Sequence, residues 1–448
     1  MYDRALAEAD GPLHDGPFAG VPFLLKDLIA LYTGEPTTGS SRFLQYHIAG
    51  HDTTMVARYR AAGLVVVGKT NASEFGLVAV TEPSFRGPAR NPWDLGRTPG
   101  GSSGGAGAAT GARFVPAAHG GDGGGSIRIP ASACGMFGLK PSRGRNPAGP
   151  HFSGTWLGLV QEHVITRSVR DSAALLDVTS APEAGGPYQP PAPARPFLRE
   201  VGTDPGRLRI AFTMEPLMGR KMHPDCIAAV EATVTLLEQL GHEVREEGPP
   251  LDKKKMTNAY LRIVGAALAA DIAHAAEVTG RKPTADQFEP VTWLMTLVGR
   301  KTGADELAAI LREVQAETHR LAAFHNRYDV LLTPTLALPP VRIGELAPTE
   351  MELKMIKALH KAPARRALDI VLKKMAAEQM DPVPNTQLFN LTGQPAMSVP
   401  LHWNAEGLPI GLQFAARVGD EATLFRLAAQ LEEAHPWVDH RPALIMTG

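Results

Sequence analysis

The stretch GGDGGGSIRIP, at residues 120–130, places a serine directly behind a run of glycines. A second stretch of the same kind, GGSSGG, lies shortly before it at residues 100–105. Segments this rich in glycine commonly form flexible linkers. A linker, however, does not continue into an apolar and partly β-branched run, and SIRIPASACGMFGLKP (126–141) has the character of a buried strand. The two stretches are therefore more typical of ordered loops with a functional role.

Two nucleotide-binding loops fit these glycines poorly. A P-loop of the form G-x-x-x-x-G-K-[ST] needs a lysine after its last glycine, and none follows here. A dinucleotide-binding loop needs a preceding strand and an acidic residue about 20 positions further on, which the local order does not supply. Acyl transfer explains them better, because glycine amides without side chains can converge on one oxygen. We expect the N–H groups of Gly123, Gly124 and Gly125 to surround a carbonyl oxygen attacked by Ser126 Oγ.

A serine hydroxyl is a weak nucleophile and needs a base. His119 lies just upstream of Ser126, but it is more typical of an ordinary loop or strand-end histidine. Lys26 ends the apolar run VPFLL (21–25). Burial at the end of such a strand lowers a lysine pKa from roughly 10.4 and leaves the amine able to accept a proton. Taken alone, Lys26 would more often be a lysine paired with Asp27.

The composition is that of an ordinary globular protein, with 448 residues, 44% hydrophobic and 20% charged. Its 45 basic and 46 acidic side chains give no field of one sign to attract nucleic acid or anionic lipid. Cys134 and Cys226 are too few for a disulfide framework and fit a reducing compartment. We see neither a signal-peptide core nor the roughly 20 apolar residues of a membrane helix. We expect a cytoplasmic protein with no nucleic-acid or membrane partner, no metal and no cofactor.

The order of the expected elements predicts the α/β class. Apolar runs that predict strands alternate with segments of helical spacing, and they lie at 21–25, 62–70, 209–213, 328–335 and 407–416. We expect one domain over residues 1–448, with a mixed, mostly parallel twisted sheet, helices on both faces and the Ser126 turn near its middle. Residues of about 180–325 and 345–384 are expected to add helical excursions. The second of these is basic and methionine-rich, and it is either a solvated helical excursion or a mobile lid.

Several motifs, in this order and spacing, resemble those of the amidase signature family of serine hydrolases. Besides the two glycine-rich stretches they are GVPFLLKD (20–27), GKTNASEF (68–75) and NPW (91–93). The signature serines of that family stand 24 residues apart, as Ser102 and Ser126 do here. The likeness is strong over residues 20–170, resumes at 328–335 and 390–416, and is weaker over about 180–325. Within the family, the chain looks like hydrolases of the 6-aminohexanoate cyclic dimer and related aryl amidases and urethane-hydrolysing enzymes.

The resemblance implies a role for each matching position. Ser126 matches the acylated nucleophile, and Ser102 matches a bridging serine that follows a cis Gly101–Ser102 peptide bond. Lys26 matches the base that draws a proton from Ser126 through Ser102 and later returns it to the leaving amine. Polar supports around the nucleophile match three further residues: Ser103, Asp122 and Arg128. The family often has an aliphatic residue where this chain has Gly123, so the loop here is expected to be unusually pliable.

The implied function is hydrolysis of C–N bonds in amides and carbamates through an acyl-enzyme. The alternative is the amidase subunit of a tRNA-dependent amidotransferase, which shares the signature. No cluster of arginines or carboxylates surrounds the signature, so we expect an apolar cleft for an uncharged small-molecule substrate. The residues predicted at its rim are Leu77, Val78, Phe152 and Trp156. The protein is expected to be a monomer or a homodimer.

Overall fold

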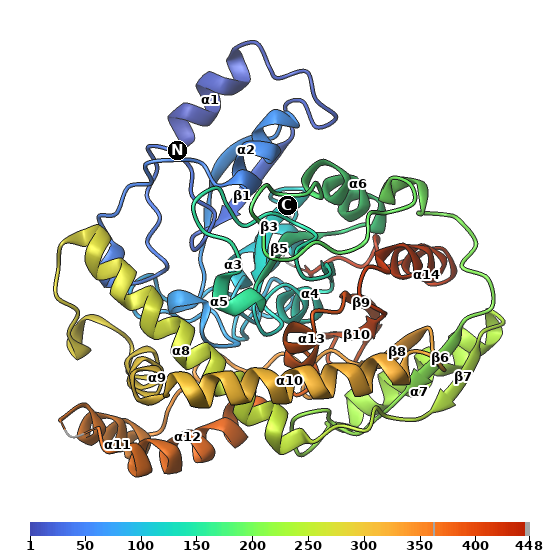
Figure 1. The fold of residues 1–448 in the computed structure, drawn as a ribbon. Helices are drawn as coiled ribbons and strands as arrows, with labels where there is room; N and C mark the ends of the chain where they lie inside the picture. The colour runs from blue at the N-terminus through green and yellow to red at the C-terminus, as the bar shows by residue number, and fades with distance from the viewer. Residues whose placement is uncertain (362, 444–448) are drawn as a thin grey trace.

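The computed structural model describes residues 1–361 and 363–443 of the chain, and its backbone is organised around one ten-stranded sheet (Figure 1). The strands are β1 (Pro22–Lys26), β2 (Val65–Thr70), β3 (Ala117–Asp122), β4 (Phe137–Lys140), β5 (Gln161–Thr166), β6 (Arg209–Phe212), β7 (Glu243–Glu246), β8 (Val330–Pro334), β9 (Ala396–Trp403) and β10 (Pro409–Ala415). Their order in the sheet is β2-β1-β3-β5-β4-β9-β10-β8-β6-β7. Segments from both ends of the described chain therefore share a single sheet.

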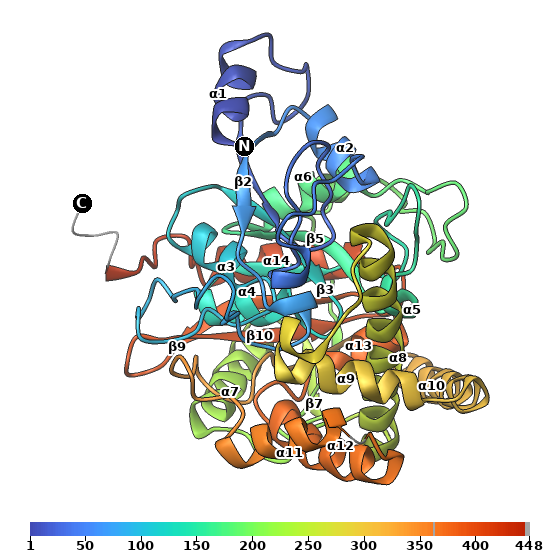
Figure 2. The same cartoon turned by 90° about the vertical axis from the view of Figure 1, so that its left-hand side faces the viewer.

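Helices surround this sheet along its whole length (Figures 1 and 2). They are α1 (Tyr2–Asp10), α2 (Thr54–Ala61), α3 (Gly104–Gly111), α4 (Arg128–Cys134), α5 (Thr155–Gly158), α6 (Val169–Thr179), α7 (Pro224–Gln239), α8 (Lys253–Thr279), α9 (Pro290–Lys301), α10 (Ala304–Phe324), α11 (Glu350–Lys361), α12 (Arg365–Met380), α13 (Gln387–Thr392) and α14 (Glu421–Ala434). Among the described residues, no helix combines the length and apolarity needed to cross a membrane.

The sheet is mixed, as expected, but parallel pairing does not dominate it. Parallel pairs lie at the two ends, where β1 joins β2 and β3 and where β6 joins β7 and β8. The pairs from β3 through β5, β4, β9 and β10 to β8 are all antiparallel. The α/β class is confirmed. The central strands differ from the prediction: a short turn joins β9 to β10, which makes that pair antiparallel, and β4 pairs antiparallel with β9 from a distant part of the chain.

Both faces of the sheet are covered, because alternate residues of each strand point to opposite sides. On β8, Val330 and Leu332 join the core beneath α6, α7 and α14. Leu331, between them, joins the core formed with α8, α9, α10 and α13. β10 shows the same division, with Phe414 on the first side and Ala415 on the second. The two-sided covering by helices matches the predicted architecture.

One expected strand is a helix. The run SIRIPASAC forms the N-cap and body of α4, and only Phe137–Lys140 at the end of the longer segment forms a strand, β4. Its apolar and partly β-branched residues suggested a strand, yet short apolar runs do not distinguish the two states. The amides of Ile127 and Arg128 donate to the carboxylate of Asp122, which satisfies the first free N–H groups of a helix.

The two predicted excursions differ in kind. Residues 180–325 contain α7, α8, α9 and α10, but they also supply β6 and β7, which form one edge of the sheet. Residues 345–384, of which 362 lies outside the described residues, form the helical pair α11 and α12. Both helices pack against α9, on the side of the molecule away from α1 and α2 (Figures 1 and 2).

Candidate active site

Lys26 stands at the end of β1 with its side chain fully buried. Its Nζ donates to Ser102 Oγ at 2.7 Å and to the carbonyl oxygen of Gly121 at 3.2 Å. Burial lowers the pKa of Lys26 to about 7, although the negative charges of Asp122 and Glu162 oppose that shift. The amine is therefore neutral in a large fraction of molecules near pH 7, which a proton acceptor requires.

Ser102 lies between Lys26 and the start of α3, and the peptide bond before it, Gly101–Ser102, is cis, as the resemblance implies. The neighbouring glycine is needed there, because a Cβ on Gly101 would meet the backbone of Val80 at 2.7 Å. Ser103 Oγ both accepts from the amide of Gly121 at 3.3 Å and approaches its carbonyl oxygen at 3.4 Å. Ser103 thereby holds Gly121, whose carbonyl oxygen accepts from Lys26.

Ser126 lies in the loop between β3 and α4 and is 7% exposed, at the wall of a cavity. Gly125 precedes it with a φ of 123°, a conformation that favours glycine. A Cβ at this position would also collide with Thr386 Oγ1. The amide of Gly125 donates to Asp122 Oδ1 at 2.7 Å, which closes the loop onto the end of β3. The glycine is thus required by both backbone conformation and space.

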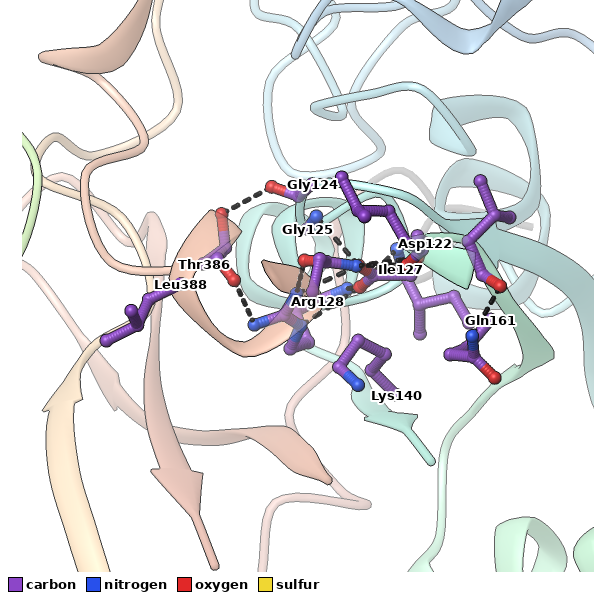
Figure 3. A network of polar contacts seen from close by, with 12 residues as sticks. Asp122, Gly124, Gly125, Ile127, Arg128, Lys140, Gln161, Thr386 and Leu388 are labelled. Carbon is purple, nitrogen blue, oxygen red and sulfur yellow. Dashed lines mark hydrogen bonds and ion pairs between the residues drawn. The ribbon is translucent and has the colours of Figure 1, made fainter. Parts of the chain in front are cut away.

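Asp122 and Arg128 form a buried ion pair beneath this loop (Figure 3). Arg128 donates to both carboxylate oxygens, at 3.0 Å from Nε and 2.8 Å from Nη2. Its remaining N–H groups donate to Thr386, Gln413 and Asn390. Burial alone would raise the pKa of Asp122, but the Arg128 guanidinium and other donors hold it at about 2. The pair therefore remains charged and fixes the loop to α13 and β10.

The three glycine amides expected around an oxyanion are not equivalent. The N–H of Gly125 is already bonded to Asp122, so it serves the loop rather than a ligand. Within the described part of the chain, no protein group accepts from the amides of Gly123, Gly124 or Ser126. Those three donors lie at or next to Ser126 and remain available to a substrate oxygen.

His119 lies on β3 and is buried away from the cavity. Its Nδ1 accepts the backbone N–H of Lys26 at 3.3 Å, and its Nε2 lies 2.9 Å from Glu162 Oε2. With Nδ1 accepting, Nε2 carries the proton and donates to the carboxylate. The ring thus supports the strand that carries Lys26, and the structure gives it no contact with Ser126.

The cavity at Ser126 opens to solvent, and the space within its outline, open solvent included, is about 760 Å³. Its walls come from residues far apart in the chain: Gly76, Leu77, Val78, Ala79, Gly124, Ser126, Ile129, Tyr260, Leu261, Val264, Val291, Leu294, Met295, Leu372, Met380, Val383 and Gln387. None of these lining side chains is a carboxylate, an ammonium or a guanidinium group. Leu372 and Met380 belong to α12, so the methionine-rich excursion forms one wall.

Of the four predicted rim residues, the structure brings two to this cavity. Leu77 and Val78 line it. Trp156 instead packs in the core, where its ring fills the space beside Gly123 and its Nε1 donates to Asp271 Oδ2 at 3.1 Å. Phe152 is 62% exposed in the surface loop before α5 and does not line the cavity. Although both aromatic residues follow Ser126 within about thirty positions of the sequence, neither lines the cavity.

The residues at the site that were not predicted include Tyr260, Thr386, Gln387, Asn390 and Gln413. Asn390 donates to the backbone oxygen of Asp122 at 2.8 Å, and Thr386 donates to that of Gly124 at 2.6 Å. Asn390 opens the segment NLTGQPAMSVP, whose likeness to the family was the available signal. Tyr260 lies in the weakly similar middle of the chain, and nothing in its local pattern marked it.

Residues 2–425 match the family model described as Amidase. The chain is 38% identical over 452 residues to a 6-aminohexanoate-cyclic-dimer hydrolase of Pseudomonas sp. (strain NK87), covering 99% of this chain and 88% of that protein. A solved 6-aminohexanoate cyclic dimer hydrolase superposes with a TM-score of 0.89 at 36% identity, covering 99% and 90% of the two chains. A bacterial aryl acylamidase superposes with a TM-score of 0.84 at 26% identity and the same coverage.

Proposed function

The chain belongs to the amidase family, whose members hydrolyse amides, and we propose that it cleaves amides and carbamates through an acyl-enzyme formed on Ser126. The observation that carries this proposal is the buried hydrogen bond of 2.7 Å between Lys26 Nζ and Ser102 Oγ. A lysine with a pKa of about 7, hydrogen-bonded to Ser102, would supply the base that the Ser126 hydroxyl lacks.

In the proposed acylation step, neutral Lys26 accepts the proton of Ser102 while Ser102 takes the proton of Ser126. Ser126 Oγ then forms a bond to the substrate carbonyl carbon, and the carbonyl oxygen gains negative charge. The free amides of Gly123 and Gly124 would donate to that oxygen. Lys26 returns its proton through Ser102 to the leaving nitrogen as the C–N bond breaks.

Deacylation reverses these proton movements with water in place of the amine. Water attacks the acyl carbon and gives up a proton through Ser102 to Lys26. The proton then passes to Ser126 Oγ as the acyl–oxygen bond breaks. A carbamate presents the same carbonyl to Ser126 and the same nitrogen to the relay, so both substrate classes fit one sequence of steps.

The cavity supports bulky, uncharged acyl or alkoxycarbonyl groups on an aryl amine. Its lining side chains are mainly aliphatic, and none bears a formal charge at neutral pH. A charged acyl group would lose its hydration there without gaining a partner. An aryl amine also leaves more readily than an alkyl amine, so breaking the C–N bond depends less on prior protonation of the nitrogen. The relative named as an aryl acylamidase agrees with an aryl amine, whereas the relative named for the 6-aminohexanoate cyclic dimer supports only a bulky, uncharged amide.

The test compares kcat/KM for an aryl amide, an aryl carbamate and acetamide. We expect kcat/KM for both aryl substrates to be at least about tenfold higher than for acetamide, because only they bury apolar surface against the cavity walls. Ser126→Ala should abolish turnover of each, whereas Ser180→Ala, a serine outside the site, should leave it unchanged. A preference for acetamide or for a charged acyl group would contradict the proposed substrate class. Turnover retained by Ser126→Ala would contradict the proposed mechanism.

A further inference from the structure

Gln387 has an unsatisfied polar atom at the wall of the cavity. It is the first residue of α13, is 3% exposed and lines the cavity together with Ser126. Its Oε1 is buried and has no hydrogen-bond partner among the described residues. Buried amide oxygens are nearly always paired, because an unpaired one loses its hydration without compensation. A partner from outside the chain would remove that penalty.

Tyr260 presents a second polar atom to the same cavity. It projects from α8, and its Oη lies so close to Gly124 that a Cβ on that glycine would collide with it. Among the described residues, no group forms a hydrogen bond with this hydroxyl. Burial raises the pKa of Tyr260 above its ordinary value, so the hydroxyl keeps its proton and remains a donor.

Tyr260 contacts the nucleophile loop, and Gln387 directly follows a residue that does. Thr386, which directly precedes Gln387, donates to the carbonyl oxygen of Gly124 and leaves no room for a side chain on Gly125 (Figure 3). Tyr260 approaches the same loop from α8. An acceptor and a donor, neither of them engaged, thus stand on two elements beside the residues that would hold the reacting carbonyl group. The rest of the cavity is almost wholly apolar.

We propose that Gln387 and Tyr260 bind the two polar atoms of the scissile group. Gln387 Oε1 accepts the N–H of a secondary amide or carbamate, after its terminal amide turns toward the substrate. Tyr260 Oη donates to the carbonyl oxygen, beside the amides of Gly123 and Gly124. The inference rests on the proposed function, since it assigns how that site selects its substrate. It makes the enzyme selective for N–H-bearing substrates over esters, which have no N–H to offer.

The test uses a matched pair of substrates, an anilide and the phenyl ester of the same acyl group. Gln387→Met keeps the size of the side chain and removes its acceptor. We expect it to lower kcat/KM for the anilide at least about tenfold and to change that of the ester less than about threefold. Comparing variants with the unmodified protein cancels the greater intrinsic reactivity of the ester. Tyr260→Phe should lower both rates together, because both substrates carry the carbonyl oxygen.

Met295→Leu, at another lining position, serves as the control and should move both rates equally. An unchanged anilide-to-ester ratio in Gln387→Met would overturn the inference, and so would Tyr260→Phe with both rates intact. If Gln387→Met does not fold, binding to Ser126→Ala decides the matter. That variant should bind the anilide at least about tenfold more tightly than the ester, and equal affinity would count against Gln387. Loss of the inference leaves the role of Ser126 standing, whereas turnover by Ser126→Ala would remove the proposed function itself.

Discussion

At the scale of single residues, the site depends on how Lys26 is surrounded. Its burial favours the neutral amine, while the carboxylates of Asp122 and Glu162 favour the ammonium form, and burial prevails. His119 stands between Glu162 and the backbone of Lys26, so it links the carboxylate to the strand without touching Nζ. The sequence predicted a lowered pKa from the position of Lys26 at the end of an apolar strand. It did not reveal Glu162, one of the two carboxylates that limit the lowering of this pKa.

The proposed base predicts a specific pH dependence. Because the pKa of Lys26 is about 7, kcat/KM should rise with pH through the neutral range and level off above it. Glu162→Gln removes a negative charge that raises this pKa, so the midpoint should move to lower pH, by up to about one unit. Glu238→Gln, an exposed carboxylate on α7, should leave the profile in place. If kcat/KM stays constant from about pH 5 to about pH 9, the range in which a group with such a pKa titrates, Lys26 is not the base.

At the scale of elements, the conformation of the loop from β3 to α4 determines where Ser126 lies. Asp122 at the end of β3 accepts from Gly125, Ile127 and Arg128, so one carboxylate closes the loop and begins the helix. This explains why a segment with strand-like alternation becomes α4. The decisive partners of Arg128 come from α13 and β10, hundreds of residues away, and no local pattern discloses them.

Gly125→Ala tests this loop directly. Its φ of 123° is unfavourable for alanine, and the added Cβ would collide with Thr386, so we expect both a lower Tm and a loss of turnover of at least about a hundredfold. Gly202→Ala is the matched control, since it also has a positive φ but open space around it. That control should cost about 1 kcal/mol of stability and no activity. If the two substitutions change turnover equally, the close packing of Gly125 against Thr386 is not required for activity.

At the scale of the whole molecule, the α/β class, five of the ten strands and the family could be predicted from apolar periodicity and from motifs close together in sequence. The cavity could not, because its walls come from the loop at Leu77 and from α8, α9, α12 and α13, which lie far apart in the sequence. Local reasoning accordingly placed Phe152 and Trp156 at the rim and overlooked Tyr260. The organisation of residues 1–448 as one domain stays a prediction, supported by the single sheet shared by early and late strands.

The central claim is that Ser126 is the nucleophile activated through Ser102 and Lys26. The most direct measurement is intact-mass and peptide analysis of the full chain after reaction with a fluorophosphonate, which forms a covalent bond to activated serines. We expect one adduct per chain, located on Ser126, absent from Ser126→Ala and formed at least about a hundredfold more slowly in Lys26→Ala, because the serine then lacks its base. An adduct on another residue, or equal labelling rates in the unmodified chain and Lys26→Ala, would contradict the account.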